Sequence, residues 1–176
     1  MAAMTERQDA MPPPNARGPS RGRRAARLAA AQALYELEIG GAGVDSVVEQ
    51  FWSRFGADML GGDEGHEMDR AFFSALVRGV VDRRGEIDRL VASALQGALN
   101  FDRLELLIKV VLRAGAFEIL ARPDVPPRVA IAEHVGVSHA FFGERETALV
   151  NGVLDRIART VRPAEMDGAG DGTTAG

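Results

Sequence analysis

The 176-residue chain contains no cysteine, one tryptophan, one tyrosine and, among its 21 basic side chains, a single lysine. The absence of cysteine excludes a disulfide framework and a thiolate metal site, and it suits a reducing cytoplasm. The chain also lacks a signal-peptide-like apolar run at its start and any run of about 20 apolar residues, the length that a membrane span needs. We therefore expect a cytoplasmic protein that consists of one domain with tails.

Charge is unevenly distributed, although the net charge is only −4. Residues 1–27 carry six arginines against two acidic side chains, a local net charge of +4. The remaining 149 residues carry 15 basic and 23 acidic side chains, a net charge of −8. A basic N-terminal arm on an acidic body indicates a polarised molecule, so the overall isoelectric point says little about its partners.

Apolar residues recur with helical spacing between about residues 21 and 162, and no segment alternates with the period of two that is typical of a half-buried strand. Residues 1–20 and 163–176 lack this periodicity and are rich in small or polar residues, so we expect both ends to be disordered. Gly40-Gly41 should stop the first helix, and Pro126-Pro127 can open a late one. The pattern predicts an all-α bundle of six or seven helices with short connections.

The sequence offers no convincing catalytic or metal-binding pattern. His66-Glu67 begins like a zinc-protease helix, but the second histidine of that motif is missing. His134 and His139 are five residues apart, which turns them about 140° away from each other on a helix. No glycine-rich phosphate loop follows a strand, and no serine has the surroundings of a nucleophile elbow. We interpret the histidines as surface or partly buried residues, and we expect no enzyme activity, catalytic residue, metal or cofactor.

Arginines gather at the start of the first expected helix, which should run from Arg21 to Ile39. At 100° per residue, Arg24 and Arg27 continue the apolar stripe of this helix instead of lying opposite to it. We therefore expect this basic end to project past the bundle, with Arg23 adding further charge. Guanidinium groups bind phosphate oxygens in pairs, and a helix N-terminus adds free N–H groups and the positive end of the helix dipole.

The arginine cluster by itself leaves two interpretations open, a site for RNA or DNA and a solvated basic tail. Gln32 lies on the shoulder of the same stripe, where its amide could reach a base edge. Tyr35 is a core residue more often than a base-stacking platform. Asn151 and Gly152 both weaken the last helix, glycine by about 1 kcal/mol relative to alanine. We interpret this pair as a packing device that lets another helix approach closely, with Asn151 bonded to a buried backbone group.

Four motifs, in the same order along the chain, resemble those of the bacterial transcription antitermination factor NusB family. They are Arg23-Arg24-Ala25-Ala26-Arg27 with Gln32-Ala33-Leu34-Tyr35, Leu112-Arg113-Ala114-Gly115-Ala116-Phe117-Glu118, Asp124-Val125-Pro126-Pro127-Arg128-Val129-Ala130-Ile131-Ala132-Glu133, and Val150-Asn151-Gly152-Val153-Leu154-Asp155. Phe117 stands in place of the usual tyrosine, and Ala132 replaces an asparagine. Together the motifs are highly specific and span about residues 21 to 162.

This resemblance implies a NusB-like domain over residues 21–162, made of two packed three-helix sub-bundles. It also implies binding to the boxA element of nascent RNA, jointly with the ribosomal protein NusE, in a complex that makes RNA polymerase resist termination on ribosomal RNA operons. The RNA-facing residues would be Arg21, Arg23, Arg24, Arg27, Gln32 and Arg145. Arg145 stands where the family often has an acidic residue, and Leu149 replaces a common phenylalanine. Tyr35 and Asp102 would lie towards the protein partner.

Three functions therefore compete at this point: an RNA-binding antitermination adaptor, an accessory to an enzyme, and a purely structural helical partner. NusB-like domains also occur at the front of ribosomal RNA cytosine methyltransferases, but that activity needs a catalytic domain downstream. Because this chain stops at Gly176, we expect no methylation by it. The sequence also leaves open whether the protein is a monomer or a homodimer that associates over its RNA face.

Overall fold

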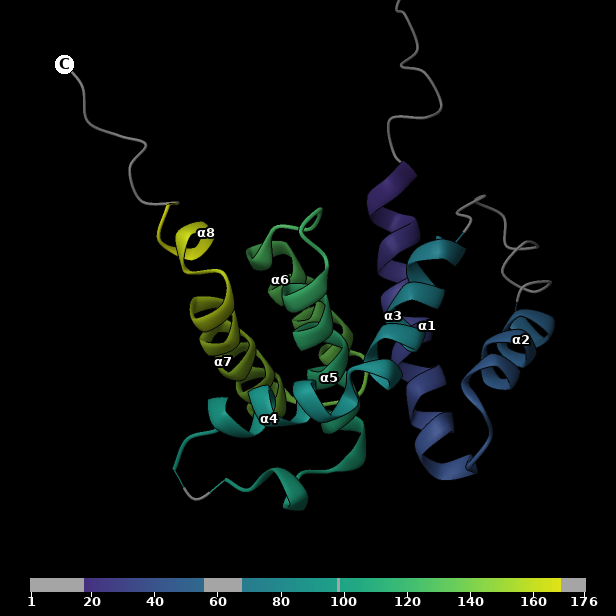
Figure 1. The fold of residues 1–176 in the computed structure, drawn as a ribbon, viewed down its shortest axis with the longest axis horizontal. Coiled ribbons are helices and arrows are strands. Elements are labelled where there is room, and N and C mark those ends of the chain that lie inside the picture. Colours follow the sequence, from purple (N-terminus) through teal and green to yellow (C-terminus); the bar gives the residue numbers. More distant parts are fainter. Residues whose placement is uncertain (1–17, 56–67, 98, 169–176) are drawn as a thin grey trace, which may run out of the picture.

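The computed structural model describes residues 18–55, 68–97 and 99–168, which form eight α-helices and one 3-10 turn and contain no strand (Figure 1). The elements are α1 (Gly18–Gly40), α2 (Val44–Phe55), α3 (Arg70–Asp82), α4 (Arg84–Ala94), η1 (Phe101–Arg103), α5 (Leu106–Ala121), α6 (Pro127–His139), α7 (Glu144–Val161) and α8 (Pro163–Asp167). The predicted all-α class is confirmed. The outer parts of both expected tails and the His66-Glu67 motif lie outside the described residues.

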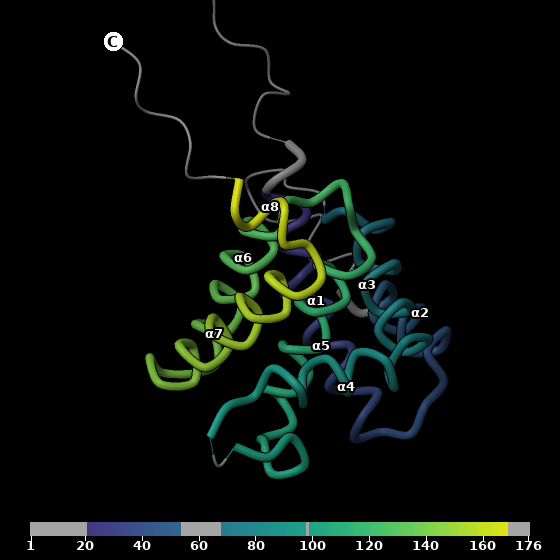
Figure 2. Tube along the Cα trace, turned by 60° about the vertical axis from the view of Figure 1, so that its left-hand side comes forward, coloured from purple at the N-terminus to yellow at the C-terminus, as the bar shows by residue number. Residues whose placement is uncertain are grey.

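The helices form two groups that share a central helix. Helices α1, α2 and α3 contact one another, as do α5, α6 and α7, and α4 packs against α5 and α7. Helix α5 also contacts α1 and α3, and all of its residues from Val110 to Ile119 are buried. Figure 2 shows α2 and α3 on one side of the molecule and α6 and α7 on the other. This arrangement agrees with the two three-helix sub-bundles that the family resemblance implies.

Several helix ends fall where the local sequence predicts them. Helix α1 ends at Gly40, and Gly41 follows with a φ of 64°, a left-handed conformation that glycine adopts without strain. Helix α6 begins at Pro127, where the missing N–H of proline has no helical partner to lose. Helix α3 is capped by Asp69, whose carboxylate accepts a hydrogen bond from the N–H of Phe72 (2.9 Å).

The junction at Arg83 decides between six and seven main helices. Its φ of −106° and ψ of 18° take it out of the helical conformation, so the apolar stripe from residue 72 to residue 95 is divided between α3 and α4. The Arg83 guanidinium donates to both carboxylate oxygens of Glu86, at 2.8 and 3.0 Å. The seven-helix interpretation therefore holds up to residue 161.

The short helix α8 lies in the region that we expected to be disordered from residue 163 onward. It begins with Pro163, its Met166 side chain is buried, and Arg162 pairs with Glu165 at its start. A single apolar anchor of this kind has no periodicity, so the sequence pattern could not indicate it. None of the described helices is both long and apolar enough to cross a membrane.

The packing role that we assigned to Asn151 and Gly152 is wrong. Asn151 is exposed, and a side chain at Gly152 would meet only the guanidinium of Arg156, on its own helix, about 3.5 Å away. Close helix contacts that require glycine occur elsewhere. At Gly79 in α3, an added Cβ atom would lie 2.0 Å from the ring of Phe117 in α5.

Candidate nucleic-acid interface

The arginine-bearing end of α1 is packed into the molecule, so our expectation that it projects past the bundle is wrong. Helix α1 contacts α3, α5 and α6, and the N–H of Asp69 before α3 donates to the carbonyl oxygen of Gly22 (3.2 Å). The inner face of this end is made of fully buried alanines, among them Ala26 and Ala30. Because alanine side chains are small, the neighbouring helices approach closely and surround the arginines on the same face.

Arg27 is a buried structural residue. Its side chain is only 3% exposed, and its Nε donates to Oε2 of Glu118 at 2.9 Å, with a second bond from Nη2 to Oε1. The ring of His134 contacts the same Glu118 oxygen through Nε2 (2.9 Å). Arg27 therefore presents almost no surface to a ligand, and we do not retain it as an RNA contact.

Glu118 is the ionised centre of this buried network. Burial by itself would raise the pKa of the Glu118 carboxyl group, but hydrogen bonds with Arg27 and His134 and the nearby positive charge outweigh it and lower the pKa to about 2. The carboxylate is fully buried. The network thus joins α1, α5 and α6 through one desolvated ion pair with an attached imidazole.

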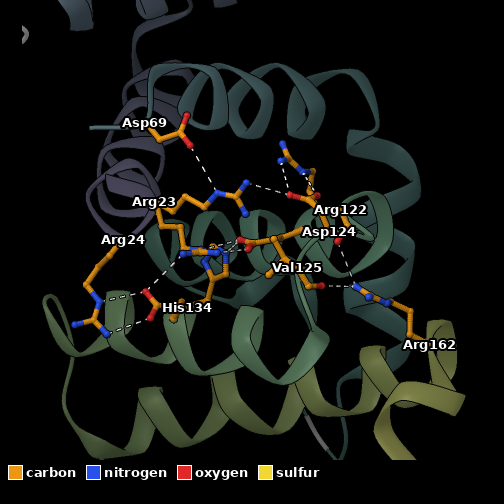
Figure 3. Close-up of polar contacts among 11 residues, drawn as sticks. Arg23, Arg24, Asp69, Arg122, Asp124, Val125, His134 and Arg162 are labelled. Carbon is orange, nitrogen blue, oxygen red and sulfur yellow. Dashed lines mark hydrogen bonds and ion pairs between the residues drawn. The ribbon is translucent and has the colours of Figure 1, made fainter. Parts of the chain in front are cut away.

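Arg23 occupies an intermediate position, 30% exposed. Its Nη2 lies 3.2 Å from a carboxylate oxygen of Asp124, and its Nε lies 3.6 Å from one of Asp69 (Figure 3). Its guanidinium also lies over the ring of Phe72. Asp124 also accepts bonds from Arg122 at 2.8 and 3.0 Å. The hydrogen bonds from Arg122 are the main reason that the pKa of the Asp124 carboxyl group falls to about 2.

Arg24 is the accessible arginine of the motif, with 74% of its side chain exposed. It donates from Nε and Nη2 to the two oxygens of Glu133 in α6, at 3.2 and 3.1 Å. Figure 3 shows Arg24 at the edge of the arginine cluster. Two grooves of about 250 and 240 Å³ flank it between α1 and α6, and Glu133 lines both. A phosphate approaching from solvent can reach Arg24 without moving a helix.

The other predicted RNA-facing residues lie on the surface around this face. Arg21, Gln32 and Arg145 are all exposed. Along α1 and α6, Arg24 lies beside Glu133 and Leu28 lies near Val137, so the two helices run in the same direction. Arg24 and Arg27 share Glu133, and Arg23 lies beside Arg27 over the ring of Phe72. No described contact joins Gln32 or Arg145 to these arginines.

Tyr35 and Asp102 are both accessible. Tyr35 is 37% exposed, so the interpretation of this residue as core is wrong. Asp102 lies in η1, where its backbone N–H donates to the side chain of Asn100 and its carbonyl oxygen accepts from Lys109 (both 2.9 Å). Figures 1 and 2 place the C-terminal end of α1 and the segment around η1 at the same end of the molecule, opposite α8.

The two described histidines do not form a metal site. His134 is fully buried against Glu118, more deeply than we predicted, and His139 is exposed at the end of α6. Within the ranges that the structure describes, no group of three or more His, Asp or Glu side chains could hold a metal ion.

The acidic partners of the arginines are functional residues that the sequence pattern did not predict. Glu118, Asp124 and Glu133 lie 91 to 109 residues from the arginines that they contact. All three belong to the motifs that carry the family resemblance, but motif membership alone does not assign a contact. A correlation between these acidic positions and the arginines was the one available signal, and it requires several sequences.

Comparisons with known proteins identify the family of the chain. The model of the NusB family matches residues 24–159, which include the pairs Arg24–Glu133 and Arg27–Glu118. The chain is 47% identical over 140 residues to the transcription antitermination protein NusB of Rhizobium rhizogenes, covering 80% of this chain and 88% of that one. The chain belongs to the NusB family. NusB proteins are antitermination factors, so the expectation that the chain is not an enzyme is confirmed.

Solved structures show the same NusB fold. NusB of T. maritima has a TM-score of 0.67 and 27% identity, and the match covers 82% of this chain and 95% of that one. A crystal structure of NusB and NusE in complex with double-stranded RNA has a TM-score of 0.67 at 22% identity, covering 80% and 98% of the two chains. At 22% identity, the likeness to the NusB–NusE–RNA structure shows that this chain has the same fold.

Proposed function

We propose that this protein is a transcription antitermination factor that binds boxA RNA together with the ribosomal protein NusE. The main support is that Arg24 presents a solvent-exposed guanidinium within an arginine cluster on a NusB fold. Relatives named as antitermination proteins and a NusB structure with NusE and RNA support the same function. In this proposal the protein acts in the cytoplasm, within the complex that makes RNA polymerase resist termination on ribosomal RNA operons.

The residues contribute unequally. Arg24 is the principal phosphate contact, and the partly exposed Arg23 is the second. Arg21, Gln32 and Arg145 extend the RNA surface along the outer sides of α1 and α7. Arg27 has a structural role beneath the RNA surface, because its buried guanidinium is hydrogen-bonded to Glu118. Tyr35 and Asp102 face NusE at the other end of α1.

An RNA titration tests this proposal. A boxA-containing oligoribonucleotide and a scrambled one are titrated at two salt concentrations, with and without NusE. We expect a preference for boxA, and a dependence on salt that falls by roughly 0.7 in log–log slope when Arg24→Ala removes one phosphate contact. Arg83→Ala is the matched control, because Arg83 also pairs with a glutamate but lies at the far end of α3. Equal binding of both RNAs would contradict the boxA preference, and the absence of binding to either RNA would favour a purely structural role.

The same titration can test the partner surface and the assembly state. Tyr35→Ala should weaken the gain in RNA affinity that NusE provides, without changing RNA binding by the protein alone. Light scattering of the free protein and of the RNA complex decides between monomer and homodimer. If RNA dissociates a homodimer, the two copies associate over the RNA face.

A further inference from the structure

We infer that Glu133 competes with RNA for Arg24, and that its carboxylate sets the affinity of the site by occupying the guanidinium until a phosphate replaces it. This inference rests on the proposed function, since it assumes that Arg24 binds RNA. Glu133 uses both carboxylate oxygens on the guanidinium, in the paired geometry with which arginine also binds a phosphate. A carboxylate and a phosphate cannot occupy that edge together.

The position of Glu133 makes the exchange feasible. Arg24 is mostly exposed, whereas Glu133 is only 19% exposed and also lies 3.6 Å from Nη1 of the buried Arg27. When Arg24 turns towards RNA, the Glu133 carboxylate therefore keeps a cation beside it. An exposed ion pair of this type is weak, so little resists the exchange. Arg27 and Glu118 cannot exchange in the same way because both are buried.

The exchange also explains how an acidic surface can bind RNA through this helix. Each arginine of the α1 motif faces at least one carboxylate: Arg23 faces Asp69 and Asp124, Arg24 faces Glu133, and Arg27 faces Glu118. The positive charges of these arginines are thus already paired with carboxylates of the same protein. A phosphate has to displace an internal anion, and the pair of Arg24 and Glu133 is the most exposed place for this displacement.

The test compares RNA affinity in variants of the full chain, in complex with NusE, using a boxA-containing single-stranded oligoribonucleotide. Glu133→Gln should tighten binding about two- to five-fold, the worth of an exposed ion pair, and should steepen the salt dependence. Glu86→Gln, which removes the carboxylate paired with Arg83, is the control for the change in net charge and should leave affinity unchanged. Glu133→Asp retracts the carboxylate while keeping its charge near Arg27, and should tighten binding to a lesser degree.

The double variant Arg24→Ala/Glu133→Gln separates competition from other effects. If Glu133 acts on RNA only through Arg24, the gain from Glu133→Gln disappears in the Arg24→Ala background. Weaker or unchanged binding by Glu133→Gln overturns the inference, and weaker binding would mean that Glu133 orients Arg24 for RNA. If Arg24→Ala itself leaves RNA binding intact, the assignment of Arg24 in the proposed function fails as well.

Discussion

Replacement of Arg27 by methionine should destabilise the protein strongly while its neighbour Arg24 tolerates the same change. Arg27→Met leaves the buried Glu118 carboxylate with His134 as its remaining side-chain hydrogen-bond partner. Removal of one partner from a buried ion pair costs about 3 to 5 kcal/mol in the free energy of unfolding. Arg24→Met removes the same charge, but its pair with Glu133 is largely exposed, so the loss should stay below about 1 kcal/mol.

Urea unfolding measures both losses. Far-UV circular dichroism follows all helices, and the fluorescence of Trp52, whose ring lies against Phe73, follows the α1–α3 group. In a thermal experiment the Arg27→Met melting temperature should fall by about 6 to 20 °C, at 2 to 4 °C per kcal/mol for a chain of this size. The double variant Arg27→Met/Glu118→Met should regain part of the loss, because it removes the stranded charge.

A stable Arg27→Met variant would refute this reasoning. If it unfolds like the unmodified protein and loses RNA affinity as Arg24→Met does, Arg27 contacts RNA and the buried pair with Glu118 is not its main role. Intact folding of both single variants, with equal losses in the salt slope of RNA binding, would restore the assignment that the sequence pattern suggested.

Two further predictions concern stability. The pKa of Glu118 is about 2 in the folded protein against an ordinary value of 4.5, so its ionised carboxylate stabilises the fold above pH 4.5 and this stabilisation is lost as the pH falls towards 2. Between pH 6 and pH 3 the free energy of unfolding should drop by about 2 kcal/mol more than in a Glu118→Gln variant. Equal pH profiles of the two proteins would contradict the ionised state of Glu118. Gly79→Ala places a methyl group 2.0 Å from the Phe117 ring and should lower the free energy of unfolding by about 1 to 3 kcal/mol. Gly136→Ala is the control and should not lower it, because an added Cβ there meets nothing within 4 Å. If Gly79→Ala leaves the free energy of unfolding in urea unchanged, α3 can move away from α5.

The fold was largely predictable because its signals are local. Apolar stripes, the stop at Gly40-Gly41 and the start at Pro127 each depend on neighbouring residues, and the structure has helix ends at both places. Helix α8 escaped prediction because it depends on one buried side chain, Met166, and on contacts with residues distant in sequence, including the bond from Arg128 to the Met166 carbonyl oxygen.

The site was predictable in position but not in the role of each residue. A helical wheel correctly places Arg24 and Arg27 beside the apolar face. It cannot say which of the two is covered, because that depends on Glu118 and Glu133, which reach α1 from α5 and α6. The same limit applies to Tyr35, which is exposed, because the exposure of a helical residue depends on the elements that pack around it.

The contacts of Arg162 have a consequence for the synthesis of the protein. Its guanidinium donates to the carbonyl oxygens of Val125 (2.8 Å) and Arg122 (3.3 Å), and so holds the loop that brings Asp124 to Arg23. The arginines of α1 leave the ribosome early, yet this brace is among the last parts of the fold to emerge. Because the chain is made from its N-terminus, a growing copy that ends before Glu118 exposes Arg24 and Arg27 without their paired carboxylates. The surroundings of Arg23 are therefore complete only after Arg162, at the end of α7, has been synthesised.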